Sequence, residues 1–179
     1  MTPITESVTF RFEKMVLEQL KREAEQKRIN LNTLLNQIVK SHIEWHALAP
    51  QAGYVPLRKP LIRGMVDSLT REQIDEIANR YVQDVSDPTL MITGKKFSPE
   101  SFLELVDRWM RATGFEYQHE VSKSNNNHRH FVYVILHNMG QNWSYLMAQI
   151  LGRAASSFTI KKPDMRATES TLYIALDLE

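Results

Sequence analysis

Hydrophobic and polar residues alternate over residues 7–13, near the start of the chain. The two kinds fall on opposite sides of an extended backbone, with Val8, Phe10 and Phe12 on one side and Ser7, Thr9 and Arg11 on the other. A period of two residues is typical of a half-buried β-strand. No partner strand is predicted nearby, and so short a strand cannot satisfy its hydrogen bonds alone. We therefore expect it to pair with the same strand of a second copy of the chain.

Two helices are predicted next. Apolar residues recur there at helical spacing, first at Val16, Leu17, Leu20 and Ala24, and then at Leu31, Leu34, Leu35, Ile38, Val39 and Ile43. Such spacing places each series on one face of a helix. The pattern breaks at Arg28, and Asn30 and Asn32 are both suitable N-caps for the second helix.

The strand and the two helices, in this order, resemble the ribbon-helix-helix DNA-binding family, which includes the Arc, MetJ and CopG repressors. The resemblance covers residues 5–46 and rests on two motifs, TFRF from Thr9 and INLNTLLNQIV from Ile29. It implies a homodimer whose two strands form an antiparallel ribbon that enters the major groove of double-stranded DNA. Ser7, Thr9 and Arg11 would then face the bases, with Arg11 making a bidentate contact to guanine.

The resemblance also implies a phosphate contact at the start of the second helix, because a helix N-terminus favours an anion. The residues concerned are Arg28, Asn30, Asn32 and Thr33. Many family members have glycine in the turn before this helix, where this chain has Arg28 or Ile29. A left-handed backbone conformation costs about 1 kcal/mol or more without glycine, so the sequence favours a turn built differently.

The rest of the chain is predicted to form a second domain of the α+β class, with an antiparallel sheet covered by helices. We expect the ribbon-helix-helix domain to span residues 1–49, a proline-containing linker to span 50–60, and a sensor or oligomerisation domain to span 61–179. The second domain matches no family pattern that we recognise.

Residues that typically begin or end helices and strands predict the elements of this second domain. One helix is expected after a cap at 68–70, with Glu72 as the reciprocal capping partner. A second runs from Ser98-Pro99 to Gly114, and a third follows Gly140 with Trp143 facing inward. The strands are expected at 115–121, 130–137, 158–162 and 171–178.

Histidines are concentrated in the hairpin between the first two of these strands. If its turn is centred near Ser124 and Asn125, His119 lies opposite His130, and His128 shares their face. Three imidazoles on one face could bind a transition metal such as zinc, nickel, cobalt or copper. The pattern is similar to the nickel-responsive repressor, although that protein completes its site with cysteine. The alternative is that these are ordinary half-exposed residues at a strand end.

Two further candidates carry weaker signals. His42 and His46 are four residues apart on a predicted helix, which is a metal-ligand spacing, but no third ligand lies close in sequence. The segment from His137 to Ser144 leads from a strand through glycine into a helix N-terminus, where anions and ligands often bind. In both cases we favour a structural role over ligand binding. The first pair would be partly packed histidines, and the second segment would be a tight strand-to-helix connection.

Composition narrows the functional classes. The chain has 179 residues, a formal net charge of +1 and no cysteine, which excludes disulfides and thiolate metal sites. No apolar stretch is long enough for a membrane span, and no signal peptide is evident, so we expect a cytoplasmic protein. A nearly neutral chain that binds DNA must concentrate its positive charge locally.

These patterns favour a dimeric, sequence-specific transcriptional regulator with a ligand-sensing or oligomerising C-terminal domain. An antitoxin whose C-terminal region binds a toxin protein is the first alternative, although antitoxin tails are usually short and disordered. An enzyme domain tethered to DNA is the second. We expect no catalytic activity, because the sequence contains no phosphate loop, dinucleotide-binding glycine pattern, metalloprotease motif or serine nucleophile elbow.

Overall fold

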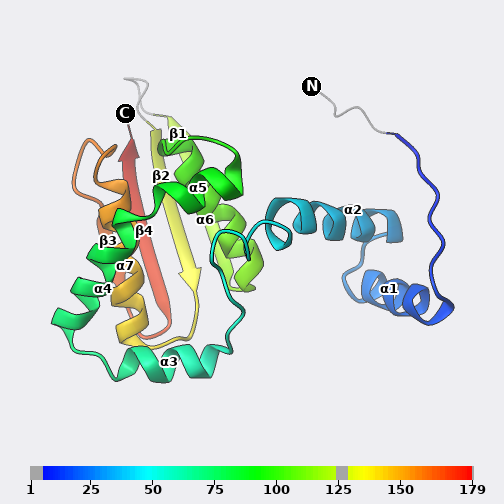
Figure 1. Cartoon of the computed structure of the whole chain (residues 1–179), viewed down its shortest axis with the longest axis horizontal. Helices are drawn as coiled ribbons and strands as arrows, with labels where there is room; N and C mark the ends of the chain where they lie inside the picture. Colours follow the sequence, from blue (N-terminus) through cyan, green and yellow to red (C-terminus); the bar gives the residue numbers. More distant parts are fainter. Residues whose placement is uncertain (1–5, 124–128, 179) are drawn as a thin grey trace. The chain divides into compact units, whose positions relative to one another are not determined.

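The computed structural model describes residues 6–123 and 129–178, which divide between two compact units, residues 1–42 and 43–179. The elements, in chain order, are α1 (Lys14–Gln26), α2 (Leu31–Ser41), the π-helical turn η1 (His42–His46), α3 (Lys59–Asp67), α4 (Arg71–Gln83), α5 (Ser86–Thr93), α6 (Pro99–Thr113), β1 (Glu116–Lys123), β2 (Arg129–Leu136), α7 (Gln141–Ala155), β3 (Asp164–Ala167) and β4 (Thr171–Leu178) (Figure 1). None of the described helices is long and apolar enough to cross a bilayer.

The N-terminal unit consists of an extended segment followed by α1 and α2. The strand predicted over residues 7–13 is not formed: residues 6–13 have no regular secondary structure, and all the described strands belong to the C-terminal unit. A strand needs a partner for its backbone groups, and no described segment of the same chain supplies one. Both predicted helices are present, with Asn30 as the N-cap of α2.

The turn between α1 and α2 keeps the left-handed residue that the sequence argued against. Arg28 has φ of 54°, and its N–H donates to the carbonyl of Glu25 at 3.0 Å. The N–H of Ile29 donates to the carbonyl of Ala24 at 3.0 Å. This pair of bonds is the Schellman motif, which satisfies carbonyls left over at the end of a helix. The hydrogen bonds therefore hold the arginine in a conformation that usually requires glycine.

The C-terminal unit is built on an antiparallel sheet with the order β1-β2-β4-β3. Helix α6 is followed by the hairpin β1–β2, and α7 is followed by the hairpin β3–β4. The second strands of the two hairpins, β2 and β4, pair along their whole length at the sheet centre, with Tyr133 opposite Ile174. The α+β class and the antiparallel sheet predicted from sequence are thus confirmed for this unit.

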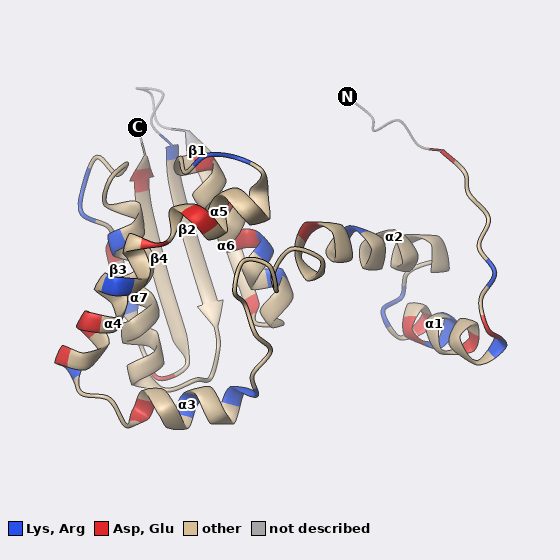
Figure 2. Cartoon of the chain, in the orientation of Figure 1, with Lys and Arg blue, Asp and Glu red and all other residues tan. Residues whose placement is uncertain are grey.

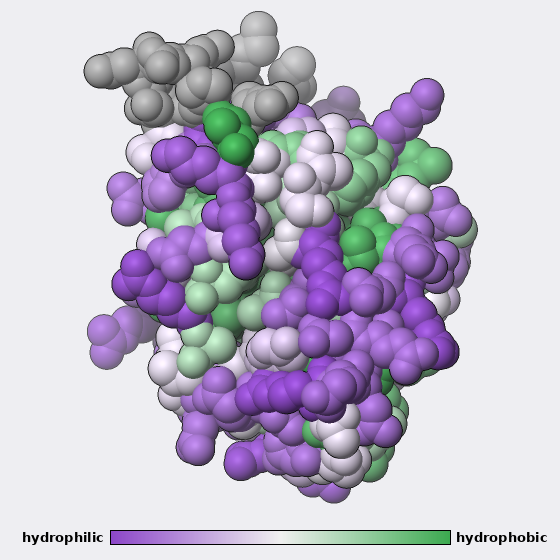
Figure 3. Space-filling view, turned by 90° about the vertical axis from the view of Figure 1, so that its left-hand side faces the viewer, coloured by the Kyte–Doolittle hydropathy of each residue, from purple (hydrophilic) through white to green (hydrophobic). Residues whose placement is uncertain are grey.

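The main core lies on one face of this sheet. Alternate residues of β2, Phe131, Tyr133 and Ile135, are buried there beneath α6 and α7 (Figure 1). The residues between them point the other way, and Val134 and Leu136 are 37% and 40% exposed. This alternation is the expected signature of a sheet with one covered face. Hydrophilic side chains dominate the aspect of the molecule shown in Figure 3, with smaller hydrophobic patches between them.

Several element boundaries follow their predicted signals. Ser98 caps α6, Pro99 occupies its first turn, and Gly114 ends it with φ of 65°. Thr70 caps α4, but its reciprocal partner is Gln73 and not Glu72, because Gln73 occupies the third helical position that a capping box uses. Helix α7 follows Gly140 as expected.

Other predictions are wrong. The third strand is β3 at Asp164–Ala167, whereas the predicted segment 158–162 contributes only an isolated bridge from Thr159 to Leu178. Two short helices were not predicted: α3 begins inside the expected linker 50–60, and α5 begins where Ser86 to Pro88 suggested a break. Proline is compatible with a first helical turn, because the N–H it lacks has no partner there.

We predict that Arg28→Gly stabilises the N-terminal unit by about 1 kcal/mol, since glycine adopts the left-handed conformation without steric cost. Hydrogen exchange of the full chain, followed over residues 14–41, should show slower exchange. Gln26→Gly, at the last residue of α1, is the matched control and should speed exchange, because glycine disfavours a helix. Faster exchange in Arg28→Gly would contradict the strain assigned to this turn.

Candidate functional site

The extended N-terminal segment presents both of its sides to solvent. The three residues predicted to face DNA bases are exposed: Ser7, Thr9 and Arg11. The apolar side is exposed as well, with Val8 at 72% and Phe10 at 63%. The apolar side chains of this segment are therefore not buried by the rest of the N-terminal unit.

Helices α1 and α2 add to this uncovered apolar surface. Met15 on α1 is 65% exposed, and Ile38 and Val39 on α2 are 43% and 52% exposed. Only Ala24 and Leu34 are buried among the described residues of this unit. Fully burying a large aliphatic or aromatic side chain contributes about 1.5–3 kcal/mol to stability. Covering this apolar surface would therefore be the largest further contribution to the stability of the unit.

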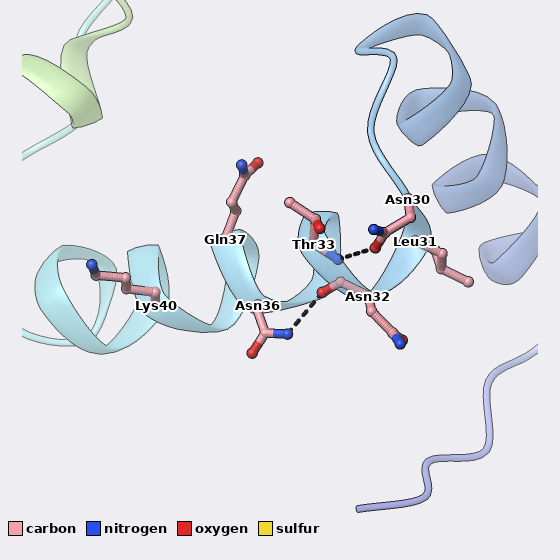
Figure 4. A pocket seen from close by; sticks show the side chains of 7 residues that line it. All are labelled: Asn30, Leu31, Asn32, Thr33, Asn36, Gln37 and Lys40. Atoms are coloured by element: carbon pink, nitrogen blue, oxygen red, sulfur yellow. Dashed lines mark hydrogen bonds between the residues drawn. The ribbon is translucent and has the colours of Figure 1, made fainter. Parts of the chain in front are cut away.

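The start of α2 combines a satisfied cap with an open polar surface. The Asn30 side chain accepts a hydrogen bond from the Thr33 N–H at 2.8 Å, and Asn36 donates to the Asn32 carbonyl at 2.8 Å (Figure 4). No acidic residue lies in the first turn. The positive end of this helix dipole is therefore not neutralised locally, which favours an anion nearby.

A shallow hollow, lined mostly by residues of polar type, extends this surface along α2. It is lined by Asn30, Leu31, Asn32, Thr33, Asn36, Gln37 and Lys40. Sequence reasoning identified only the first turn of this surface. The remaining members follow at helical spacing from Thr33, a signal that the apolar series on the same helix concealed.

Charge in the N-terminal unit is mixed. Residues 1–42 contain seven Lys or Arg and five Asp or Glu, and α1 carries both signs (Figure 2). The predicted base-facing side of the extended segment carries Arg11, and the turn before α2 carries Arg28, both exposed. These two exposed arginines are the positive charges on the surfaces that the sequence predicted to face DNA.

The histidine pairing predicted for the C-terminal hairpin is wrong. His119 lies opposite Tyr133, and His130 lies opposite Ser122. Because partners across a sheet share a face and adjacent residues alternate, His119 and His130 point to opposite faces. The pairing is displaced by three residues from the predicted one, since Tyr133 and not His130 lies opposite His119. His128, the third proposed metal ligand, lies outside the described residues.

Each of the two described histidines has local partners. The His119 ring stacks with two tyrosines, its centre 6.0 Å from that of Tyr117 and 5.5 Å from that of Tyr133. His130 Nδ1 lies 2.7 Å from a carboxylate oxygen of Asp177 on the neighbouring strand. Within residues 6–123 and 129–178, no three potential metal ligands gather. His42 and His46 are both exposed.

The connection from β2 to α7 is a buried hydrogen-bonded joint, as the sequence favoured. His137 Nδ1 accepts from the Met139 N–H at 2.9 Å, and Nε2 lies 2.9 Å from the Ser144 hydroxyl. The Ser144 hydroxyl also lies 2.5 Å from the Thr168 carbonyl. Trp143 is in the core, with its ring 4.4 Å from the His137 ring.

This joint is not arranged to activate Ser144 as a nucleophile. Because His137 Nδ1 accepts a backbone N–H, the proton of the neutral ring is on Nε2, which donates to Ser144. A general base would instead need an unprotonated nitrogen facing the hydroxyl. Burial lowers the pKa of His137 from 6.5 to about 4, which keeps the ring neutral.

The lowered pKa of His137 predicts a loss of stability in acid. The unfolded chain binds a proton below pH 6.5 and the folded chain only below about 4, so stability is complete above 6.5 and falls as pH decreases between the two values. We expect a loss of about 1.5 kcal/mol between pH 6.5 and 5 from this group. Urea unfolding followed by tryptophan fluorescence measures it.

His137→Gln should abolish this dependence and lower stability at neutral pH. His119→Gln, which changes an exposed histidine of the same unit, should retain it. The assignment fails if His137→Gln loses stability as steeply as the parent over this pH range.

No protein-family model, curated protein or solved structure shows significant similarity to this chain.

Proposed function

We propose that the protein is a dimeric, sequence-specific DNA-binding transcriptional regulator. Two copies of the segment 7–13 pair as an antiparallel ribbon that enters the major groove. The C-terminal unit senses a ligand or builds a higher oligomer. The proposal extends the resemblance of the N-terminal residues to the ribbon-helix-helix family.

The uncovered apolar side chains of the N-terminal unit carry this proposal. Val8 and Phe10 alternate with polar residues, so pairing two segments would place all their apolar side chains on one face. That face would then cover Met15 and other exposed residues of α1 and α2. A second copy is the simplest partner, because it supplies the missing strand and the missing core together.

The opposite face of such a ribbon would carry Thr9 and Arg11 from each copy. The major groove accommodates a two-stranded ribbon and presents a distinct pattern of donors and acceptors for each base pair. The guanidinium of Arg11 fits the two acceptors of guanine, and the Thr9 hydroxyl can either donate or accept.

The start of α2 supports a separate role in orientation. Its first turn lacks acidic residues, Asn30 caps it, and the exposed Arg28 lies two residues before this cap. A DNA phosphate at this helix end would fix the register of the ribbon without reading sequence. One ribbon reads few base pairs, so adjacent sites occupied by several dimers would raise specificity.

A gel-shift titration on the DNA upstream of the protein's own gene tests the proposal. We expect Arg11→Ala to weaken binding by about ten- to a hundredfold and to reduce the preference over unrelated DNA, since a bidentate guanine contact contributes about 1–3 kcal/mol. Arg22→Ala removes an exposed arginine of α1 and should change binding little. Equal affinity and selectivity for Arg11→Ala and the parent would refute base reading by the ribbon.

A further inference from the structure

All the tryptophans of the protein line one hollow in the C-terminal unit. The hollow has a volume of about 460 Å³, which is within the range of small-molecule sites. Its aromatic lining consists of Trp45, Tyr54, Trp109, Phe115 and Trp143. These residues come from η1, the segment after it, α6, the residue before β1, and α7, so their convergence was not visible in the sequence.

The walls of this hollow, which we call the aromatic hollow, are held in place by packing on both sides. Trp45 is buried in a cluster with Ile92 and Leu105, and its ring lies 4.9 Å from Tyr54. Elsewhere in the lining, the Phe115 ring packs edge-on to Trp143, with ring centres 5.2 Å apart. A preformed apolar wall favours ligand binding, because little ordering is required when the ligand enters.

Charged contacts fix η1 against α6. A guanidinium nitrogen of Arg108 donates to the Glu44 carbonyl at 3.1 Å, and Arg111 contacts the Glu44 carboxylate at 3.2 Å. Burial, with a contribution from the neighbouring Tyr81, raises the pKa of the Tyr54 phenol above its usual value. Tyr54 therefore stays neutral.

Lys59 is the one lysine or arginine among the residues that line the hollow, which also include His46. The ammonium of Lys59 lies 4.2 Å from the centre of the Phe115 ring, and the residue is exposed to solvent. None of the residues lining the hollow is acidic. Lys59 also begins α3, whose first turn contains no acidic residue. The lysine charge and the helix dipole therefore both favour an anion at this edge.

A smaller apolar hollow of about 170 Å³ adjoins the first and shares Tyr54 and Trp109 with it. Its other lining residues come mainly from α6 and α7, including Phe102 and Leu151. The apolar part of a ligand in the aromatic hollow could extend toward this smaller hollow, whose lining does not include Lys59.

We propose that the aromatic hollow binds a hydrophobic carboxylic acid, with its hydrocarbon body between the tryptophans and its carboxylate at Lys59. A cationic ligand is disfavoured by the lysine, and a polyphosphate would need more than one positive side chain. The proposal rests on the proposed function in one respect: the bound acid would act as an effector of DNA binding. Binding of the acid is tested independently of DNA.

Quenching of tryptophan fluorescence in the full chain measures this binding, because every tryptophan lines the hollow. Octanoate and phenylbutyrate are the probes, and octanol and phenylbutanol are their neutral counterparts. We expect each acid to bind about tenfold more tightly than its alcohol, as for one charge-assisted contact. No saturable quenching by either acid, or equal affinity for acid and alcohol, would overturn the proposal.

Two pairs of variants locate the site. Lys59→Met should remove the preference for the acid and leave alcohol binding unchanged, while Arg58→Met, at the neighbouring residue outside the lining, should keep the preference. Ala112→Leu, which fills the aromatic hollow, should weaken both probes at least tenfold, while Ala47→Leu should not. Thermal unfolding of each variant verifies folding, and acid preference retained in folded Lys59→Met would overturn the assignment.

The DNA assay separates this proposal from the proposed function. If the acids bind as expected but the parent protein fails to recognise DNA, the ligand site stands and the regulatory role falls. If the protein binds DNA selectively but neither acid binds, the ligand assignment falls and the DNA-binding role stands.

Discussion

Apolar side chains without a core of their own are the main constraint on the N-terminal unit. A chain of about forty residues buries too little surface to be stable alone, and usually requires a metal, disulfides or association. This chain has no cysteine, and its first 42 residues bury only Ala24 and Leu34 among those described. The proposed association would supply this stabilisation, because the exposed side chains are the ones that a paired ribbon would cover.

The C-terminal unit, in contrast, buries its apolar side chains within one chain. Two helix-hairpin segments place β2 and β4 together at the sheet centre, and both helices cover the same face. The joint between β2 and α7 buries His137 without an unsatisfied polar atom, which fixes how α7 crosses the sheet. Segments that precede α6 complete a second apolar cluster around Trp45, and the aromatic hollow lies beside it.

Local signals predicted the elements that depend on local chemistry. Caps such as Ser98 and Asn30, glycine at the end of α6, and the period of β2 all act over a few residues, so the sequence alone reveals them. Features that depend on distant partners were missed or misplaced. The register of the β1–β2 hairpin depends on pairing between strands, and the prediction was displaced by three residues, which wrongly placed His119 opposite His130.

The candidate sites likewise divide into those set by local sequence and those set by tertiary packing. The cap at the start of α2 could be located from Asn30 and its spacing to Thr33, whereas the aromatic hollow could not be predicted, because Trp45, Trp109 and Trp143 come together only through tertiary packing. The left-handed Arg28 was missed for another reason: its hydrogen bonds to α1 outweigh a conformational preference that alone argues against it.

Sedimentation equilibrium of the full chain tests the central claim most directly. If a second copy covers the N-terminal apolar surface, the mass should be at least twice the 20.9 kDa of one chain, and Phe10→Asp should shift the equilibrium toward smaller species by burying a charge in the paired face. A monomer at high protein concentration, or a Phe10→Asp variant that associates as tightly as the parent, would contradict it.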